Sequence, residues 1–406
     1  MSGMNFLEKL LDGAAVEWKP LVEVVLSTSN IKWKNTDRVY RYIDLTSVTI
    51  ETKKIAETIE ITANNAPSRA QKLVEKDDVI FATTRPTQQR YCLIDNEYSG
   101  AVASTGYCIL RAKKDEVLPK WILYCIASSD FKIYVEENQS GSAYPAISDT
   151  KVKDFLIPIP PLAIQAEIVR ILDTFTELTT ELTPELTLRQ KQYEYYRDRL
   201  LTFEEGEVEW KALGDVSLKS YSGGTPTAGT PEYYDGGTIP WLRTQEVKFS
   251  DIEETQVKIT PSALNNSAAK WIPENCVIIA ISGATAGRSA INKIPLTTNQ
   301  HCCCLEIDPE KAFYRYVFHW VSFNYENLKG LGQGARGDLN SGIIKSFKIP
   351  VPPLEEQARI VAILDKFDTL TNSISEGLPR EIALRQQQYE YYRDLLLSFP
   401  PPLTPP

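Results

Sequence analysis

The sequence predicts an α+β fold. Two α/β domains are separated by a pair of long antiparallel helices forming a coiled coil, with a pseudo-two-fold internal repeat closed into a circular arrangement. Three observations support this: the chain repeats itself, the repeated parts have helical spacing, and the parts between them have the composition of mixed sheet. An internal repeat constrains the whole fold, because both copies are expected to adopt one structure.

The repeat is clearest in a tyrosine-rich segment. LRQKQYEYYRDRLL at 188–201 returns as LRQQQYEYYRDLLL at 384–397, and twelve of the fourteen residues agree. That shift is 196 residues, whereas the other segments shift by 192, so the second copy has four extra residues between Asp365 and Leu384. The segments shifted by 192 are EWKPL (17–21) and EWKAL (209–213), IPIPPL (157–162) and IPVPPL (349–354), and ILD (171–173 and 363–365).

The residues between the matched segments diverge. Residues 21–150 and 213–348 share few identities, yet both are rich in β-branched and aromatic residues broken by Gly, Pro and Asn, as expected for sheet with loops. We call the repeated segments the frames and the unlike residues between them, 21–150 and 213–348, the inserts. Two matched frames with unlike inserts predict a scaffold that presents two different binding domains. The expected divisions are an N-terminal helical segment (1–20), a first domain (21–150), a central helical region (151–205), a second domain (206–348), a distal helical region (349–399) and a disordered tail (400–406).

The two helical regions carry apolar residues at heptad spacing. Pairs of prolines at 160–161 and 352–353 precede them, where proline is tolerated, and the four extra residues are a stutter that keeps the apolar seam continuous. We expect a kink or short break at Pro184 and at Pro379. The residues assigned to the coiled coil and to partner binding are Tyr193, Tyr196, Leu200, Tyr389, Tyr392 and Leu396.

A pair of such helices, each of about 40 residues and roughly 60 Å long, buries its apolar seams best by mutual contact. An antiparallel pair puts one insert at each end. Residues 5–11 align with 197–203, so an N-terminal helix is expected beside the end of the distal helical region, which completes a circular repeat. The alternative is an ordinary coiled coil with no measuring role.

Composition and charge limit the function classes. With 43% hydrophobic and 24% charged residues, no apolar run of membrane-spanning length and no signal-peptide pattern, we expect a soluble cytoplasmic protein without a membrane partner. The net charge of −9 argues against nucleic acid, but the two inserts are nearly neutral and the acid excess lies at 204–209 and in the C-terminal helical segment. A basic concave face on an insert therefore stays open.

No catalytic, cofactor-binding or metal site is expected. NPPY and DPPY are absent, so methyl transfer by this chain is not expected, and SGATAGRS at 282–289 has the wrong spacing for a phosphate loop. His301 and His319 have no partner pattern. The three consecutive cysteines 302–304 would alternate faces in a strand, which favours a buried strand over zinc. Trp18 and Trp210, in the two EWK segments, are interpreted as packing anchors.

The motifs identify a family. IPxPPLxxQ followed by ILDxF, at 157–175 and 349–367, and the repeated LRQxQYEYYRDxLL resemble the DNA-specificity subunit of Type I restriction–modification enzymes over essentially all 406 residues. In the second insert GGTP (223–226), IPWL (239–242), 280–288 and TNQH (298–301) resemble that family's target-recognition domains. The first insert, with VIFATTR (79–85) and ASTGYCIL (103–110), departs from these and resembles another subfamily of the domain.

The resemblance implies a division of labour. Each insert would recognise a short run of bases of double-stranded DNA in the major groove, and the helices would set the gap between two unlike half-sites. The helices would also bind two modification subunits, which carry S-adenosylmethionine, and restriction subunits would supply ATP- and Mg-dependent translocation and cleavage. This chain would hold no cofactor and would contribute specificity without catalysis.

Base recognition needs amide, hydroxyl or cationic side chains at base edges, and phosphate contacts need cations or small donors. In the second insert we assign DNA contacts to residues after IPWL, on the glycine-rich loop and in GQGARG: Arg243, Thr244, Gln245, Arg288, Gln333 and Arg336. Alignment of the frames gives the corresponding residues of the first insert: Asp44, Thr46, Thr84, Arg85, Ser140 and Tyr144. For each of them the simpler interpretation is a surface or capping residue.

Two other functions stay open. The chain could be an enzyme in its own right, such as a nuclease, although it lacks a metal or nucleotide motif. It could also be a coiled-coil adaptor whose inserts bind protein or glycans. DNA selection experiments distinguish the three.

Overall fold

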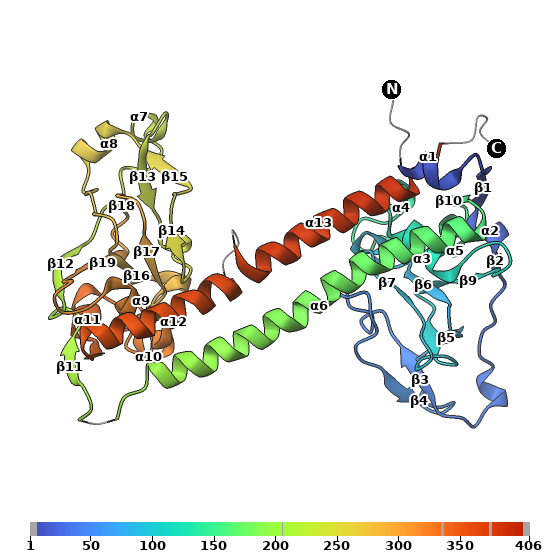
Figure 1. The fold of residues 1–406 in the computed structure, drawn as a ribbon, viewed down its shortest axis with the longest axis horizontal. Coiled ribbons are helices and arrows are strands. Elements are labelled where there is room, and N and C mark those ends of the chain that lie inside the picture. The colour runs from blue at the N-terminus through green and yellow to red at the C-terminus, as the bar shows by residue number, and fades with distance from the viewer. Residues whose placement is uncertain (1–5, 205, 334–336, 373–375, 401–406) are drawn as a thin grey trace. The chain divides into compact units, whose positions relative to one another are not determined.

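The structure is a computed structural model that describes residues 6–204, 206–333, 337–372 and 376–400. The chain divides into two units. The first unit comprises residues 1–184 and 380–406, and the second comprises residues 185–379. Both boundaries fall inside helices, α6 (Leu162–Leu200) and α13 (Gly377–Leu397), so each of these helices contributes to both units (Figure 1).

The first unit holds the first insert, the start of α6 and most of α13. Besides these two helices its elements are α1 (Phe6–Leu11), β1 (Glu17–Pro20), α2 (Leu21–Val24), β2 (Val25–Leu26), η1 (Trp33–Asn35), β3 (Tyr40–Ile43), β4 (Ile59–Ile61), β5 (Ala70–Leu73), β6 (Val79–Ala82), η2 (Pro86–Gln88), β7 (Tyr91–Leu93), β8 (Val102–Ser104), β9 (Tyr107–Ala112), α3 (Pro119–Ala127), α4 (Ser129–Asn138), α5 (Asp149–Lys153) and β10 (Leu156–Ile159).

Two four-stranded sheets form the insert, in the orders β2-β9-β6-β7 and β4-β3-β8-β5. Strand β6 lies at the centre and is buried on both faces. Val79 and Phe81 belong to the core covered by α3, whereas Ile80 and Ala82 belong to a second core. Alternating side chains of one strand thus enter two cores, as the strand period of two requires.

The second unit holds the second insert, α12 and the end of α6. Its elements are β11 (Glu209–Ala212), β12 (Ser217–Tyr221), α7 (Pro231–Tyr234), β13 (Ile239–Leu242), η3 (Thr244–Glu246), β14 (Asp251–Ile252), β15 (Val257–Ile259), α8 (Pro261–Asn266), β16 (Val277–Ala280), η4 (Gly283–Thr285), β17 (Ser289–Asn292), β18 (Thr297–Thr298), β19 (Cys302–Ile307), α9 (Tyr314–Phe323), α10 (Tyr325–Lys329), α11 (Ser341–Ser346), β20 (Lys348–Val351) and α12 (Leu354–Asn372).

Despite their unlike sequences, the two inserts share most of their strand order. The second has the sheets β12-β19-β16-β17-β14 and β15-β13-β18, so β12, β19, β16 and β17 correspond to β2, β9, β6 and β7 of the first. In β19 the side chain of Cys303 enters one core while Cys302 and Cys304 enter the other. The expected alternation in a buried strand is therefore confirmed, and so is the repeat of two α/β domains.

The EWK and IPxP segments form matching ribbons at the base of each insert. Glu17 pairs with Ile159 across β1 and β10, and Glu209 pairs with Val351 across β11 and β20, both antiparallel. Trp18 packs on the core, and its indole N–H donates to the Pro400 carbonyl at 2.8 Å. Trp210 is 44% exposed and packs edge-on against Trp320 with ring centroids 5.6 Å apart, so its role as an anchor is the weaker of the two.

A buried glutamine joins each insert to its helix. Gln165 is fully buried; its amide donates to the carbonyls of Glu116 and Pro160 and its oxygen accepts from Leu118 N–H. Gln357 makes the equivalent three bonds in the second unit, to Lys311, Pro352 and Phe313. This side chain satisfies its own polar atoms and three backbone groups, which explains the glutamine of the IPxPPLxxQ repeat.

In each unit the two long helices pack antiparallel. In the first unit the start of α6 (Leu172) shares a core with the end of α13 (Leu396), and further along Phe175 stacks on Tyr392 with ring centroids 5.2 Å apart. In the second unit Leu201, the residue directly after α6, shares a core with Ile360 of α12, and Tyr196 of α6 stacks on Phe367 with ring centroids 5.5 Å apart. A continuous coiled coil across both units stays a prediction.

The expectation at Pro184 was a kink or a short break. A break is wrong, because α6 is one helix of 39 residues with Pro184 inside it, whereas a kink there stays a prediction. Proline removes one helical hydrogen bond, and α6 tolerates the loss because packing holds it on both sides, at Leu172 and at Leu201. The restart near Pro379 is confirmed: α12 ends at Asn372 and α13 begins at Gly377, whose φ of 72° suits glycine.

The N-terminal helix lies where the repeat predicts. Leu7 of α1 is buried in the same core as Leu396 and Leu397 of α13, in the first unit. In the first unit, the end of α13 and α1 together take the place that the end of α6 has in the second unit. The tail at 401–406 lies outside the described residues.

Candidate nucleic-acid interface

Four of the assigned residues of the first unit come together. Arg85 N–H donates to the Pro145 carbonyl at 2.7 Å, and its guanidinium lies 5.5 Å from the centre of the Tyr144 ring. Thr84 and Ser140 both pair with Ala146 through isolated bridges. Tyr144 is 73% exposed and Arg85 is also exposed. This cluster offers a cation, a hydroxyl and an aromatic ring on one surface.

The backbone around Arg85 is held in an uncommon conformation. Arg85 and Gln89 have φ of 50° and 51°, in the left-handed region, and so does Lys53 with φ of 54°. The Lys53 ammonium donates to the Gln89 carbonyl and lies over the Tyr91 ring. Burial lowers the pKa of Lys53 to about 8. Non-glycine residues in this region concentrate at functional sites, where surrounding contacts must hold them.

Asp44 and Thr46 follow β3 and join the same group of loops. The Asp44 carboxylate accepts from Tyr42 OH at 3.2 Å, and its carbonyl accepts from Tyr107 OH at 3.0 Å. Arg90, at the end of the loop that holds Arg85, donates to the Val48 carbonyl at 2.6 Å. Thr46 is exposed. Arg90 and Lys53 were not among the sequence-assigned residues; no local pattern indicates them, because their partners are distant in sequence.

In the second unit two of the assigned residues after β13, Thr244 and Gln245, lie in η3, and Arg243 is the residue immediately before it. Arg243 N–H donates to Glu246 Oε1 at 3.2 Å, and its guanidinium donates to Gln256 Oε1 at 3.0 Å. Its Nε is buried and has no hydrogen-bond partner, and it is 3.6 Å from Glu246 Oε1. Thr244 is half-buried and Gln245 is exposed. Gln245 is therefore the most exposed of the three assigned side chains after β13.

Backbone hydrogen bonds bring further loops to this place. Asn299 N–H donates to the Leu242 carbonyl, and Ile281 N–H to the His301 carbonyl. The Thr225 hydroxyl bonds Gln300 at 2.6 Å. Gln300 was missed among the assigned residues, although it lies within the TNQH motif.

The glycine-rich loop is joined to the last assigned segment. Gly283 N–H donates to Asp338 Oδ1 at 3.4 Å, and Gln333 pairs with Asp338. Arg288 closes the loop and its buried Nε has no hydrogen-bond partner. Gln333 is exposed, while Arg336 lies outside the described residues. The loops after β13, after β16 and before α11 thus meet at one surface of the insert, as their counterparts do in the first unit.

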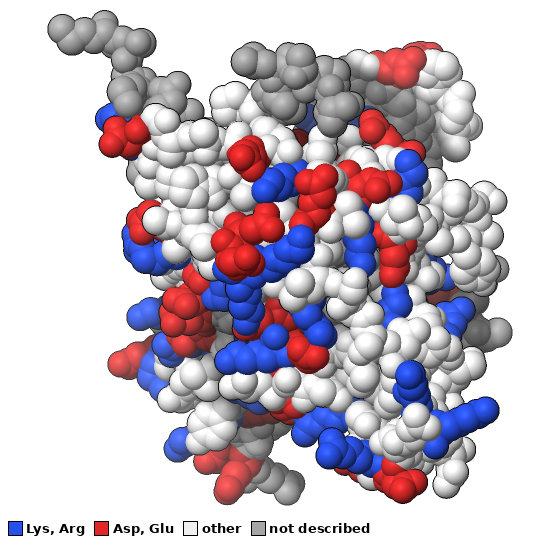
Figure 2. All heavy atoms as spheres, turned by 90° about the vertical axis from the view of Figure 1, so that its right-hand side faces the viewer, with Lys and Arg blue, Asp and Glu red and all other residues white. Residues whose placement is uncertain are grey.

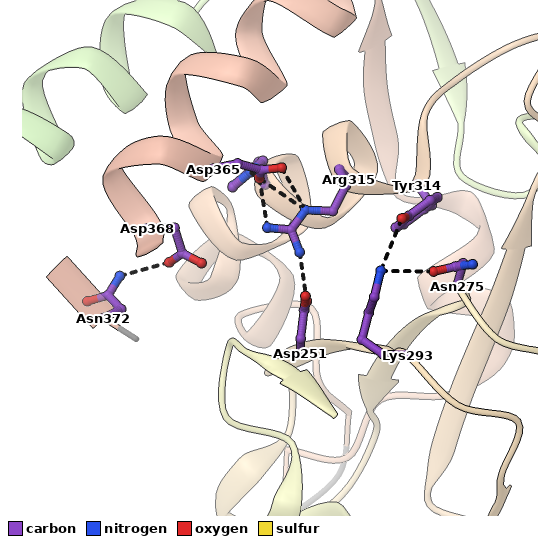
Figure 3. Close-up of polar contacts among 9 residues, drawn as sticks. Asp251, Asn275, Lys293, Tyr314, Arg315, Asp365, Asp368 and Asn372 are labelled. Carbon is purple, nitrogen blue, oxygen red and sulfur yellow. Dashed lines mark hydrogen bonds and ion pairs between the residues drawn. The ribbon is translucent and has the colours of Figure 1, made fainter. Parts of the chain in front are cut away.

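A partly buried ion cluster ties the second insert to its helix (Figure 3). The Arg315 guanidinium of α9 is 2.7 Å from Asp365 of α12 and 2.7 Å from Asp251, which follows the Arg243 segment. His319 Nε2 is 2.6 Å from the same Asp365 oxygen. Burial opposes ionisation of Asp365, but hydrogen bonds from His319 and Arg315 outweigh it and lower the carboxyl pKa.

The first unit has the corresponding contacts in a simpler form. Asp173 accepts from Lys120 Nζ and from Tyr124 OH, both at 2.6 Å.

In the second unit another cation, Lys293, lies beside the Arg315 cluster and donates to Asn275 and to Tyr314 (Figure 3). These contacts hold each insert on the helix that follows it. The hydrogen-bonded pair of His319 and Asp365 belongs to this structural cluster.

The described residues contain neither a group of side chains suited to a metal ion nor an exposed cysteine thiol. No group of three or more His, Cys, Asp or Glu side chains there could hold a metal ion. All seven cysteines are free and buried, and burial raises the pKa of the Cys302 thiol to about 12. Within the described ranges, no helix has both the length and the apolar character to cross a membrane.

The helical residues assigned to the coiled coil and to partners divide into two sets. Leu396 is buried, and Tyr193, Leu200 and Tyr389 are half-buried against the cores of their units. Tyr196 and Tyr392 are 40% and 39% exposed while stacked on phenylalanines. Their neighbours Tyr195 and Tyr391, at 58% and 63%, are still more exposed.

Comparisons with known proteins agree with this geometry. A family described as the Type I restriction modification DNA specificity domain matches twice, at residues 17–189 and 205–384. A Type I restriction enzyme specificity subunit of Escherichia coli is 39% identical over 100% of this chain and 99% of its own length. A putative Type I specificity subunit of Haemophilus influenzae is 30% identical over 97% and 98%.

Solved structures share the fold. The S subunit of a Type I system from M. genitalium has a TM-score of 0.61 at 13% identity and covers 98% of this chain and 99% of its own. The HsdS subunit of Thermoanaerobacter tengcongensis has a TM-score of 0.51 at 24% identity, covering 94% and 96%. At these identities the likeness concerns the fold.

Proposed function

Since the chain belongs to the family of Type I restriction–modification DNA specificity subunits, and is a DNA-recognition subunit that contributes no catalysis, we propose how its parts divide that task. Each insert recognises one half of a split, asymmetric site in double-stranded DNA. The first uses the loops around Asp44 and Thr46, around Thr84 and Arg85, and around Ser140 and Tyr144. The second uses the loops of Arg243, Thr244, Gln245, Arg288, Gln333 and Arg336.

One observation carries the proposal: the two inserts share a topology and place unlike side chains on corresponding loops. The loop after β3 corresponds to the loop after β13, and the loop after β6 to the one after β16. Arg85 on the first set faces Tyr144, whereas Arg243 on the second is held by Glu246 and Gln256. Unlike loops on a common scaffold favour two different base sequences.

The helices would set the spacing and bind the partners. We propose that two modification subunits, which hold S-adenosylmethionine, dock on the repeated tyrosine-rich segments, and that restriction subunits with ATP and Mg join them. The exposed rings of Tyr195 and Tyr391 support this, because the same exposed residues recur in both copies although the inserts between them diverge. A surface repeated twice fits one kind of partner bound twice.

Selection from a random DNA pool tests the proposal. The full chain with its modification subunit should enrich a split motif with a fixed gap. In that complex Arg243→Ala should relax one half-site only, and Arg85→Ala the other, each costing about 1–3 kcal/mol of discrimination. Deleting four residues between Asp365 and Leu384 should change the gap and leave both half-sites.

The outcomes separate the alternatives. Unchanged spacing in the selected DNA would refute the measuring role of the helices. No enrichment of any DNA, with or without the modification subunit, would favour the remaining candidate, a coiled-coil adaptor whose inserts bind protein.

A further inference from the structure

The connection between β2 and β3 in the first unit, residues 27–39, carries a set of free cations. Lys32, Lys34 and Arg38 are exposed, and none of the three side chains makes an ion pair or hydrogen bond with the described part of the chain. Asp37 is the one acidic residue of this connection. The segment is therefore net positive, although the chain as a whole has a net charge of −9.

The segment is held in place despite its exposure. The Trp33 indole N–H donates to the Ala70 carbonyl at 2.9 Å, and its ring meets Tyr40 edge-on with centroids 5.7 Å apart. Ile31 N–H donates to the Gln71 carbonyl at 2.8 Å. Trp33 lies between the two lysines, so its anchoring fixes where both lysine stems begin.

The anchored segment is continuous with the candidate interface of the first insert. It lies along β5, which pairs with β8, and β8 pairs with β3, the strand that leads to Asp44. The carbonyl of Arg69, an exposed cation at the start of β5, accepts from Thr105 N–H, and the neighbouring Gly106 carbonyl accepts from Thr83. The cations therefore share one small sheet with the loops assigned to base recognition.

The figures locate this sheet. Strands β3 and β4 lie at the lower end of the first unit in Figure 1. Figure 2 looks at the molecule from the side of that unit and shows Lys and Arg side chains interspersed with acidic ones over the middle of the face, with further Lys and Arg side chains near its lower edge.

The second insert has nothing equivalent. Its corresponding connection, residues 222–238 between β12 and β13, contains no Lys or Arg and two acidic residues, Glu232 and Asp235. Its backbone packs closely instead: a Cβ added to Gly223 would lie 1.9 Å from the Thr298 carbonyl oxygen. The two inserts thus share their sheets and differ in this connection.

We propose that residues 27–39, with Arg69, form a phosphate-binding element that holds the DNA backbone beside the first half-site and that the second insert lacks. The inference rests on the proposed function and adds an asymmetry to it. Exposed ammonium and guanidinium groups without protein partners need break no ion pair to bind phosphodiester oxygens, and each contact releases condensed counterions. The first half-site therefore carries more of the salt-dependent affinity.

The test compares two double variants of the chain in complex with its modification subunit. Lys32→Gln with Lys34→Gln removes two cations of the element. Lys76→Gln with Lys132→Gln removes two exposed, unpaired lysines of the same unit outside it, which matches the change in net charge. Binding to the selected DNA is measured by fluorescence anisotropy from 50 to 300 mM salt.

The first variant should reduce the slope of log K against log salt by about 2, since each phosphate contact contributes about 0.9. The control should keep the wild-type slope, and both should select the same bases. On DNA shortened so that it spans only the first half-site the difference should persist, and on DNA that spans only the second half-site it should vanish, because the phosphates beside the first insert are then absent.

Equal slopes for the two variants would overturn the inference, and so would loss of first half-site sequence selection in the Lys32/Lys34 variant, because that result assigns base recognition to these lysines. Failure of the wild-type complex to select any DNA is a separate result, since it removes the proposed function itself.

Discussion

At the scale of single residues, Asp365 joins groups that are far apart in the sequence. It binds Arg315 and His319 of α9, and through Arg315 it reaches Asp251 beside the Arg243 segment. The ILD repeat marks this aspartate and its counterpart Asp173. Their partners differ, since Lys120 is 45% exposed whereas Arg315 is 17% exposed. Less exposed pairs lose more when one partner is removed.

Asp365→Asn should lower the free energy of unfolding by about 2 kcal/mol, because Arg315 keeps only one carboxylate partner. Asp173→Asn is the matched control and should cost about 1 kcal/mol or less. Thermal unfolding of the two variants and the wild type at neutral pH measures the difference. An equal loss for both would contradict the role of burial.

The same carboxylate predicts a pH dependence. Its pKa is lowered in the folded chain, so its stabilisation is present above the unfolded value of about 3.9 and disappears as the pH falls through the lower folded value. The gap in unfolding temperature between wild type and Asp365→Asn should therefore be constant from pH 7 to about 5 and shrink below about pH 4. A gap that widens in acid would contradict this assignment.

At the scale of elements, the two mid-frame prolines have different surroundings. Pro184 lies in the interior of α6, where it removes a hydrogen bond. Pro379 is the third residue of α13, in the first turn, where the N–H would have no helical partner. One proline therefore destabilises its helix and the other does not.

Pro184→Ala should raise the free energy of unfolding by up to about 3 kcal/mol, and Pro379→Ala should change it by less than about 1 kcal/mol. Circular dichroism at 222 nm during thermal unfolding measures both. If the two variants behave alike, the continuity of α6 through Pro184 is wrong.

At the scale of the whole molecule, the repeat is circular. Leu7 near the start of the chain and Leu397 near its end share the core of the first unit, and Trp18 bonds the carbonyl of Pro400. In the second unit the chain passes without interruption from α6 to β11. Leu7 and Pro400, described residues near the two ends of the chain, thus lie where the second copy has an ordinary connection.

A circular permutant that joins the termini through a short linker and opens the chain between α6 and β11 should fold. Its unfolding temperature should stay within about 4 °C of the wild type, because the new ends lie outside both cores. It should select the same two half-sites. A permutant opened inside β16, which is fully buried, should fail to fold and serves as the control.

The repeat determined much of this from the sequence alone. Equal spacings of EWK, IPxPPL and ILD required two equivalent ribbons and helix starts, and the unlike inserts between them implied two different recognition surfaces. The family motifs and the alternation of cysteines 302–304 were also local signals. Local patterns suffice here because helical and strand periodicity place neighbours in sequence on defined faces.

Only the tertiary structure decided how the loops proposed for DNA recognition assemble. Arg85 meets Tyr144, Lys53 meets Gln89 and Arg315 joins Asp251 to Asp365, all over long sequence separations that no local pattern encodes. The continuity of α6 through Pro184 was likewise decided by packing on both sides of the proline, which outweighs the local preference for a break.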